Sequence, residues 1–383
     1  MQILISAGEA SGEMYGAQLI EALRKLDPSL DCFGVGGERM RSAGCEIIVD
    51  AKDLAVVGIT EILSHLPKIL GLYRKLIHAA DEKHPTLAVV IDSPAFNWRV
   101  ARQMRKRGIP VVYYVCPQFW AWRQGRVKLL RKYVDKALVI FPFEEKFYRD
   151  RGVDATFVGH PLADLPAPDT PREQFAIRYG LKAEKPWLAL LPGSRRKEFR
   201  LNLPTMIDAA RVLGKDYQFV LPVASTLDFQ WVHDHVFRSG HSARRRSVPF
   251  IALTRDARAS LHHSRAGIVA SGTATVEAAI MGTPFVMVYR VSPLTYALGK
   301  PRVKVPYFAM VNLIAEEEIV PELVQQKFTV ENIVTEMNKI IPDGEPRARM
   351  IEHLATVKAR LQHSSGGAHP SVVAADIILK MIG

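Results

Sequence analysis

The chain has 383 residues, of which 48% are hydrophobic and 23% charged, enough for two hydrophobic cores, since single cores stop growing at roughly 250 to 300 residues. Its three cysteines show no CxxC or Cys/His spacing, so neither a disulfide framework nor a zinc site is expected. The net charge of +12 favours an anionic partner without choosing between nucleic acid, lipid and phosphorylated ligands. No apolar run is long enough for a membrane span and no leader precedes the first strand, so we expect a cytoplasmic protein.

In the first half, apolar strand runs alternate with helical patterns. Continuous apolar runs followed by helices are typical of a parallel sheet covered on both faces, which predicts a doubly wound α/β domain. The expected strands lie at 2–8, 86–92, 109–115 and 136–143.

The first strand opens into the glycine turn AGEASGEMYG, residues 7–16. Gly8 and Gly12 suit a phosphate cradle, but Glu9 and Glu13 would repel the anion. This turn is therefore a poor dinucleotide fingerprint.

Residues 55–77 carry an apolar stripe at steps of three and four, and Pro67 is expected to divide them into two helices. Two interpretations stay open, a helix that packs on the sheet and a patch that dips into a membrane surface. The residues of this membrane patch are Val56, Val57, Ile59, Ile62 and Leu63.

The strand at 86–92 ends with Asp92 at its carboxyl edge, where ligands bind in open α/β sheets. Asp92 is the best candidate for a general base, and the alternative is that it caps the following helix.

Further along the chain, the adjacent aromatic residues of QFWAWR, residues 118–123, are too crowded to face one core. At least one of them is expected to line a cleft or an interface.

Four prolines within residues 161–171 predict a linker, after which the α/β rhythm restarts. We expect domains at 1–165 and 170–350, each with a parallel Rossmann-like sheet and both facing a cleft. The expected strands of the second domain lie within 187–194, 217–224, 247–254, 266–282 and 283–291, and helices follow residue 329.

Two glycine turns in the second domain suit phosphate. Gly193 and Ser194 precede a helix beside Arg195, and the alternative is a turn with solvent-facing arginines. Ser271, Gly272 and Thr273 open a second helix.

Glu277, one helical turn later, could bind both hydroxyls of a ribose or form a capping box. Together the turns predict a nucleoside diphosphate site. Neither GxxxxGK[ST] nor GxGxxG occurs, so ATPase and NAD-dehydrogenase functions lose support.

The combined motifs resemble the lipid-A-disaccharide synthase family. The matching segments, in order from residue 8 to about 325, are AGEASGE, VIDSPAFN, YYVCPQFWAWR, FPFE, VGHPL, LPGSR, SGTATVEAAIMGTP and NLIAEEEIVPELVQ.

The resemblance implies an inverting GT-B glycosyltransferase that joins UDP-2,3-diacylglucosamine to 2,3-diacylglucosamine 1-phosphate and releases UDP in Gram-negative lipid A synthesis. It also implies no catalytic metal or cofactor, no nucleic acid partner, and peripheral association with the anionic inner face of the cytoplasmic membrane. In this family the C-terminal helix crosses back, so residues 350–383 are expected to pack on the first domain.

Site roles follow from the same resemblance. It makes Asp92 the base for the acceptor 6-hydroxyl and assigns Arg195 to the leaving diphosphate. With the diphosphate assigned to the second domain, Glu9 becomes a catalytic candidate that binds sugar hydroxyls or orients the partner of Asp92, and Glu13 stands where the family is expected to have Asp. The implied donor site comprises Gly193, Ser194, Arg195, Ser271, Gly272, Thr273, Thr275, Glu277 and Asn312, and the acceptor side Ser11, Gly12 and Asn97.

Two other functions remain possible from the residues. A UDP-N-acetylglucosamine 2-epimerase shares this architecture and would need no acceptor. A basic membrane-surface binding module would explain the charge but not the two phosphate turns. Residues 238–248 match no motif and receive no role.

Overall fold

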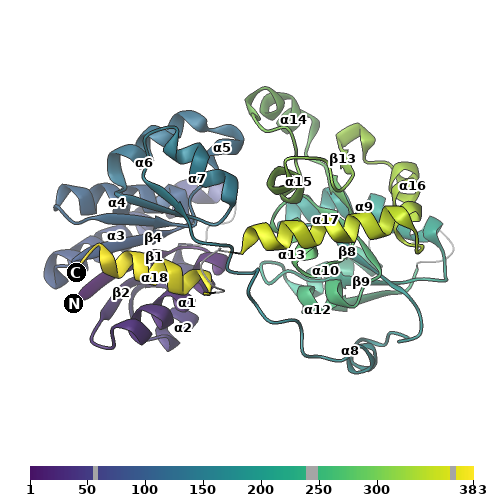
Figure 1. Ribbon diagram of the computed structural model, residues 1–383, viewed down its shortest axis with the longest axis horizontal. Coiled ribbons are helices and arrows are strands. Elements are labelled where there is room, and N and C mark those ends of the chain that lie inside the picture. The colour runs from purple at the N-terminus through teal and green to yellow at the C-terminus, as the bar shows by residue number, and fades with distance from the viewer. Residues whose placement is uncertain (55–58, 239–248, 363–367) are drawn as a thin grey trace. The chain divides into compact units, whose positions relative to one another are not determined.

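The protein is described by a computed structural model (Figure 1). Its described residues are 1–54, 59–238, 249–362 and 368–383, with the backbone alone for Ala10 and residues 59–66. The chain divides into two compact units, unit 1 with Met1–Asp164 and Leu361–Gly383, and unit 2 with Leu165–Arg360.

Unit 1 is built on a seven-stranded parallel sheet in the order β3-β2-β1-β4-β5-β6-β7, with helices on both faces (Figure 1). Its strands are β1 (Gln2–Ala7), β2 (Asp31–Gly36), β3 (Cys45–Asp50), β4 (Leu87–Ile91), β5 (Val111–Tyr114), β6 (Lys136–Val139) and β7 (Ala155–Phe157). Its helices are α1 (Ala10–Leu26), α2 (Glu38–Ser42), η1 (Ala51–Asp53), α3 (Ile59–Lys83), α4 (Pro94–Lys106), α5 (Phe119–Trp122), η2 (Gln124–Arg126), α6 (Val127–Tyr133), α7 (Pro142–Arg149) and α18 (Pro370–Lys380).

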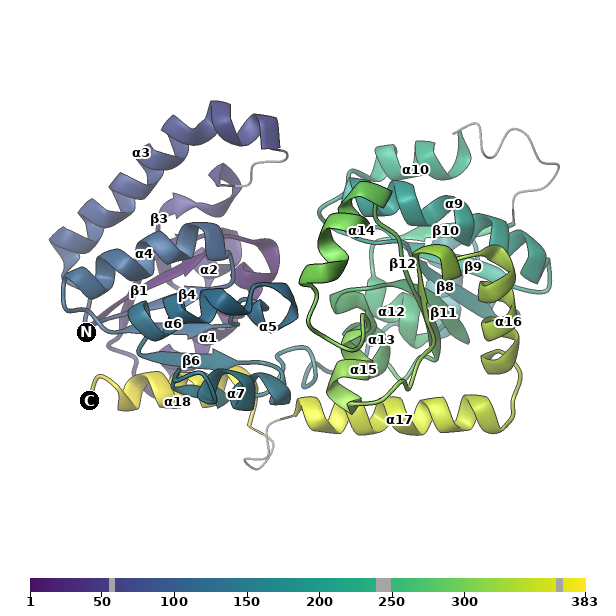
Figure 2. The ribbon, with the colours of Figure 1, turned by 90° about the horizontal axis from the view of Figure 1, so that it is seen from above.

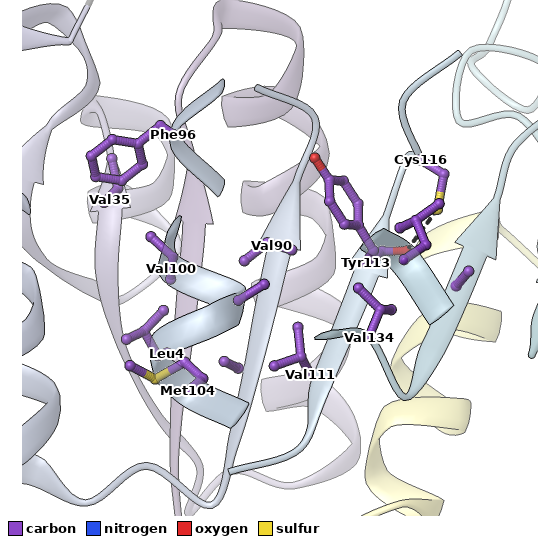
Figure 3. Packing of buried hydrophobic residues seen from close by; sticks show 14 of the residues in the cluster. Leu4, Val35, Val90, Phe96, Val100, Met104, Val111, Tyr113, Cys116 and Val134 are labelled. Atoms are coloured by element: carbon purple, nitrogen blue, oxygen red, sulfur yellow. Dashed lines mark hydrogen bonds between the residues drawn. The ribbon is translucent and has the colours of Figure 1, made fainter. Parts of the chain in front are cut away.

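One hydrophobic core of unit 1 lies between this sheet and α4 (Figure 3). Leu4, Val90 and Val111 come from three neighbouring strands and are fully buried, as are Val100 and Met104 of α4. The residues that alternate with them along the strands are buried too, because helices cover the opposite face. Burial on both faces explains why these strands read as continuous apolar runs.

Unit 2 contains a six-stranded parallel sheet in the order β10-β9-β8-β11-β12-β13 (Figure 2). Its strands are β8 (Trp187–Leu191), β9 (Gln218–Pro222), β10 (Ile251–Thr254), β11 (Ala266–Ala270), β12 (Phe285–Tyr289) and β13 (Glu322–Val324). Its helices are α8 (Arg172–Tyr179), α9 (Arg196–Leu213), α10 (Phe229–Phe237), α12 (Ala257–His262), α13 (Thr273–Ile280), α14 (Pro293–Gly299), η3 (Lys300–Arg302), α15 (Met310–Ala315), η4 (Gln325–Lys327), α16 (Val330–Ile340) and α17 (Glu345–Leu361).

The strand order reverses once in each sheet. In unit 1 the reversal places β4 beside β1, and in unit 2 it places β11 beside β8. The carboxyl ends of these strands form the crevice in which doubly wound sheets bind ligands. The fold therefore provides one candidate half-site in each unit.

Two expectations about helices differ from the structure. Pro67 does not divide its segment, since α3 continues through it. Pro67 is exposed, so water can satisfy the backbone carbonyl that the missing N–H leaves without a partner. At the C-terminal end, α17 belongs to unit 2 as far as Arg360, and the chain rejoins unit 1 at Leu361 rather than near residue 350.

Candidate active site

The turn between β4 and α4 has an unusual backbone. Asp92 and Ser93, which form this β4–α4 turn, have φ values of +47° and +44°, a region that residues with side chains rarely adopt. Ser93, not Asp92, occupies the N-cap position of α4. Such strain persists only where the surroundings fix it, and it gathers at functional sites.

Buried side chains hold the β4–α4 turn in place. The Tyr113 hydroxyl and the Asn97 amide both donate to the Asp92 carbonyl, at 2.7 and 2.8 Å. Asn97 also donates to the carbonyls of Ile91 and Ser6 at 2.9 and 3.2 Å, and accepts from the Ser6 hydroxyl at 2.7 Å. Asn97 was assigned to the acceptor side, but it is fully buried. It therefore positions Asp92 and cannot reach a substrate.

The glycine turn after β1 packs directly against the β4–α4 turn. A Cβ on Gly8 would lie 2.6 Å from the Ser93 hydroxyl oxygen, which is closer than van der Waals contact allows. A Cβ on Gly12 would meet the Ile91 carbonyl oxygen at 3.7 Å, an ordinary contact. Ser11, on the first turn of α1, is exposed. Gly8 thus has the tighter contact of these two glycines, and a Cβ there would require Ser93 to move.

The two glutamates of this glycine turn have different environments. The Glu13 carboxylate accepts from the backbone N–H of Arg39 at 2.9 Å and thereby caps α2. Glu9 is exposed at the start of α1. The pKa of the Tyr113 hydroxyl is raised by burial and by neighbouring charges, those of Asp92 and Glu9 among them. Glu9 and Asp92 therefore lie near the same hydroxyl, whereas Glu13 is committed to the fold.

A buried carboxylate anchors the aromatic segment after β5. The Trp120 indole N–H donates to Glu144 at 2.8 Å, and the backbone N–H of Phe141 donates to the same carboxylate at 3.1 Å. Burial raises the pKa of Glu144 to about 7. Trp122, in contrast, is 49% exposed and stacks under the Arg123 guanidinium at 3.8 Å. Trp120 is therefore structural, and Trp122 is the aromatic open to an interface.

The first glycine turn of unit 2 joins β8 to α9. Gly193 has φ of +119°, which favours glycine, and Ser194 and Arg195 follow it exposed. The first N–H groups of α9 have no partner within the helix, so together with Arg195 they attract anions. Arg195 pairs with Glu198 at 2.9 Å. Sequence reasoning missed Glu198, which would compete with an anion for this arginine.

The second glycine turn joins β11 to α13. Gly272 is exposed with φ of +132°, and a Cβ there would meet nothing within 4 Å. The Ser271 hydroxyl donates to the Phe308 carbonyl at 2.7 Å, and the buried Thr275 hydroxyl donates to the Gly272 carbonyl at 2.8 Å. These two hydroxyls hold the turn, while the backbone of Gly272 and Thr273 remains open to a phosphate.

Glu277 lies further along α13 and is partly buried. Burial raises its pKa, which the Arg258 guanidinium opposes. The capping-box alternative is wrong, because Gly272 is the N-cap and Thr275 occupies the third helical position. No described residue forms a hydrogen bond or ion pair with the Glu277 carboxylate. Both of its oxygens can therefore accept from ligand hydroxyls.

Asn312 was assigned to the donor site, yet it is fully buried. Its amide donates to the Val320 carbonyl and to Glu322, both at 2.9 Å, and its oxygen accepts from the backbone N–H groups of Ile319 and Val320, both at 3.0 Å. Glu322, which the sequence did not single out, also accepts from the backbone N–H of Ala309 at 2.8 Å and so caps α15. The side chain of Asn312 is therefore taken up by hydrogen bonds within the protein.

The predicted membrane patch lies outside the described part of the structure. Val56 and Val57 are not described, nor are the side chains of Ile59, Ile62 and Leu63. Within the described ranges no helix is long and apolar enough to cross a bilayer. The same ranges contain no group of three His, Cys, Asp or Glu side chains suited to a metal ion.

The two parallel-sheet units place this chain in the GT-B fold class. The glycotransferase of kitacinnamycin has a TM-score of 0.65 at 14% identity, covering 100% of this chain and 99% of that one. CalG4, the calicheamicin glycosyltransferase, has a TM-score of 0.62 at 16% identity, covering 100% of this chain and 98% of that one. UDP-GlcNAc 2-epimerase from Neisseria meningitidis, bound to UDP-GlcNAc, has a TM-score of 0.64 at 12% identity, covering 100% of this chain and 99% of that one. At these identities the likeness shows the fold alone.

Sequence similarity identifies the family. A model of the lipid-A-disaccharide synthetase family matches residues 3–375. Lipid-A-disaccharide synthase of Koribacter versatilis is 55% identical over 94% of both chains, and that of Acidobacterium capsulatum is 51% identical over 96% of this chain and 93% of its own. The chain belongs to the lipid-A-disaccharide synthetase family and is a glycosyltransferase. The epimerase alternative is not favoured, and the non-enzymatic alternative is wrong.

Proposed function

We propose that the protein transfers the sugar of UDP-2,3-diacylglucosamine to 2,3-diacylglucosamine 1-phosphate, giving the lipid A disaccharide 1-phosphate and UDP. Membership of the family across residues 3–375 carries this choice of reaction. Unit 1 takes the acceptor, because its half-site presents carboxylates and no basic turn. Unit 2 takes the nucleotide, because its two glycine turns suit phosphate.

Asp92 acts as the general base. It accepts the proton of the acceptor 6-hydroxyl while that oxygen forms a bond to the anomeric carbon of the donor. The bond from this carbon to the diphosphate breaks on the opposite face, so the configuration inverts and UDP leaves with the electron pair. Arg195 and the backbone N–H groups after Gly193 and Gly272 stabilise the charge on the departing diphosphate.

Two further carboxylates bind sugar hydroxyls. Glu277 accepts from the ribose hydroxyls of the nucleotide, which its partial exposure and the absence of a hydrogen bond or ion pair to any described residue support. Glu9 accepts from hydroxyls of the acceptor sugar beside Asp92. We also propose that the patch from Val56 to Leu63 brings the protein to the anionic inner face of the cytoplasmic membrane, which the net charge of +12 favours.

Replacement of Asp92 tests the mechanism. Asp92→Asn should lower disaccharide formation by about 10² to 10⁴-fold, as loss of a general base does, with UDP affinity unchanged. Product and UDP are followed by mass spectrometry with and without the acceptor, and UDP binding by calorimetry. The matched control is Asp31→Asn, an exposed carboxylate at the amino end of β2 in the same sheet.

Near-normal turnover in Asp92→Asn would remove Asp92 from the mechanism. UDP release by the wild-type protein without acceptor would contradict the synthase reaction itself.

A further inference from the structure

One exposed apolar segment of unit 2 takes no part in the half-site described above. In α14 the side chains of Leu294 and Leu298 are 71% and 56% exposed, and no residue of this helix is buried. The two leucines are one helical turn apart and so share a face. Single exposed leucines are common on protein surfaces, but a pair on one short helix is an apolar patch.

Basic residues follow this patch directly. Lys300, Arg302 and Lys304 are all exposed, and no acidic residue occurs between Glu277 and Glu316. These cations are held close to the helix: the Arg302 guanidinium donates to the Leu298 carbonyl, and the Lys300 ammonium lies 5.7 Å from the centre of the Tyr296 ring. Apolar and cationic side chains are thus presented together by one continuous segment.

We propose that this segment, α14 with η3 and Lys304, is a contact surface of unit 2 for an anionic lipid bilayer. An apolar helix flanked by Lys and Arg binds such a surface through leucine insertion and attraction to acidic headgroups. A site for one acyl chain would be concave and enclosed, whereas α14 has no buried residue and stands at the periphery of unit 2 (Figure 1).

The segment acts independently of the predicted patch in unit 1 and of the proposed reaction. Vesicle binding requires neither substrate, so its failure would leave the transfer reaction untouched. Failure of the transfer reaction would likewise leave this surface in place.

The experiment is vesicle flotation of the full chain with Leu294→Asp/Leu298→Asp and, separately, Lys300→Glu/Arg302→Glu/Lys304→Glu. Vesicles consist of phosphatidylcholine alone or mixed with phosphatidylglycerol. We expect each variant to bind the mixed vesicles about ten-fold more weakly. The control, Ile177→Asp/Val212→Asp, alters side chains of the same unit that are 83% and 61% exposed and should bind as the wild type does.

Three outcomes would overturn the proposal. Unchanged binding of both α14 variants is the first, and equal wild-type binding to neutral and anionic vesicles is the second. The third is a change in oligomeric state, measured by light scattering, with vesicle binding intact. That result would make the surface an interface between copies of the chain.

Discussion

The half-sites of the two units occupy the same place in two related sheets but are built in opposite ways. In unit 1 the β4–α4 turn carries non-glycine residues in the left-handed region and is held by buried donors, the Tyr113 hydroxyl and the Asn97 amide. In the two glycine turns of unit 2 the left-handed positions are Gly193 and Gly272, and the residues that follow them, Ser194 and Thr273, are exposed. The first arrangement fixes one carboxylate, and the second leaves backbone N–H groups accessible.

This difference fits the two tasks of a glycosyltransferase. A general base must stay within hydrogen-bond reach of one proton, so its backbone has to be held tightly. A diphosphate is bound by several N–H groups at once, which requires close approach of the ligand to the main chain. Strain is therefore tolerated at the β4–α4 turn, whereas the two glycine turns of unit 2 avoid it.

Among the variants that leave Asp92 itself in place, the largest expected effect comes from filling the contact at Gly8. Gly8→Ala forces a Cβ against Ser93, and we expect kcat to fall about ten- to a hundred-fold as the β4–α4 turn shifts. Gly12→Ala, which adds only an ordinary contact, should stay within about three-fold. The kcat values of both variants are measured by steady-state kinetics and compared with that of the wild type. Equal losses would show that the packing at Gly8 does not govern Asp92.

A smaller effect is expected in unit 2. Glu277→Gln should raise the KM for the donor about ten-fold with kcat nearly unchanged, because charged hydrogen bonds to the ribose are lost. Burial raises the pKa of Glu277, so this carboxylate is protonated at a higher pH than an exposed glutamate is. The donor affinity of the wild type should therefore begin to fall at that higher pH as the solution is acidified. Glu277→Gln should not show this pH-dependent fall in donor affinity. Glu173→Gln, on the exposed surface of α8, is the control.

A pH profile of donor KM that is the same in wild type and Glu277→Gln would contradict the ribose contact.

The smallest effect tests the clamp on Asp92. Tyr113→Phe removes the hydroxyl that donates to the Asp92 carbonyl, and we expect kcat to fall about five-fold with UDP affinity unchanged. The neighbouring Tyr114 is also fully buried, but its hydroxyl has no partner among the described residues. Tyr114→Phe should therefore leave kcat unchanged. If both variants behave alike, the Tyr113 hydrogen bond does not position the base.

The sequence predicted those strands whose burial on both faces leaves a clear pattern. β1, β4, β5 and β6 in unit 1 are confirmed, as are β8, β9, β10, β11 and β12 in unit 2. β2 (DCFGVG) and β3 (CEIIVD) were missed because glycine or charged residues interrupt their apolar runs. β7 and β13 have three residues each, too few to show a period.

The candidate site was predictable where a residue follows directly from a strand. Asp92, Gly193 and Gly272 lie at strand ends, so the rule for parallel sheets places them at an edge. Asn97 and Asn312 could not be assigned from sequence, because a polar residue near a site can face either a ligand or the backbone. Tyr113, Glu198 and Glu322 were missed, since their partners become apparent only in the folded chain.

The return of the chain to unit 1 has a consequence for biosynthesis. α18 packs along α1, although α1 is translated near the start and α18 only after the whole of unit 2 (Figure 2). Domains usually complete folding in the order in which they leave the ribosome. Here unit 2 is contiguous and can finish first, whereas unit 1 must wait with one face of α1 uncovered until residues 370–380 emerge.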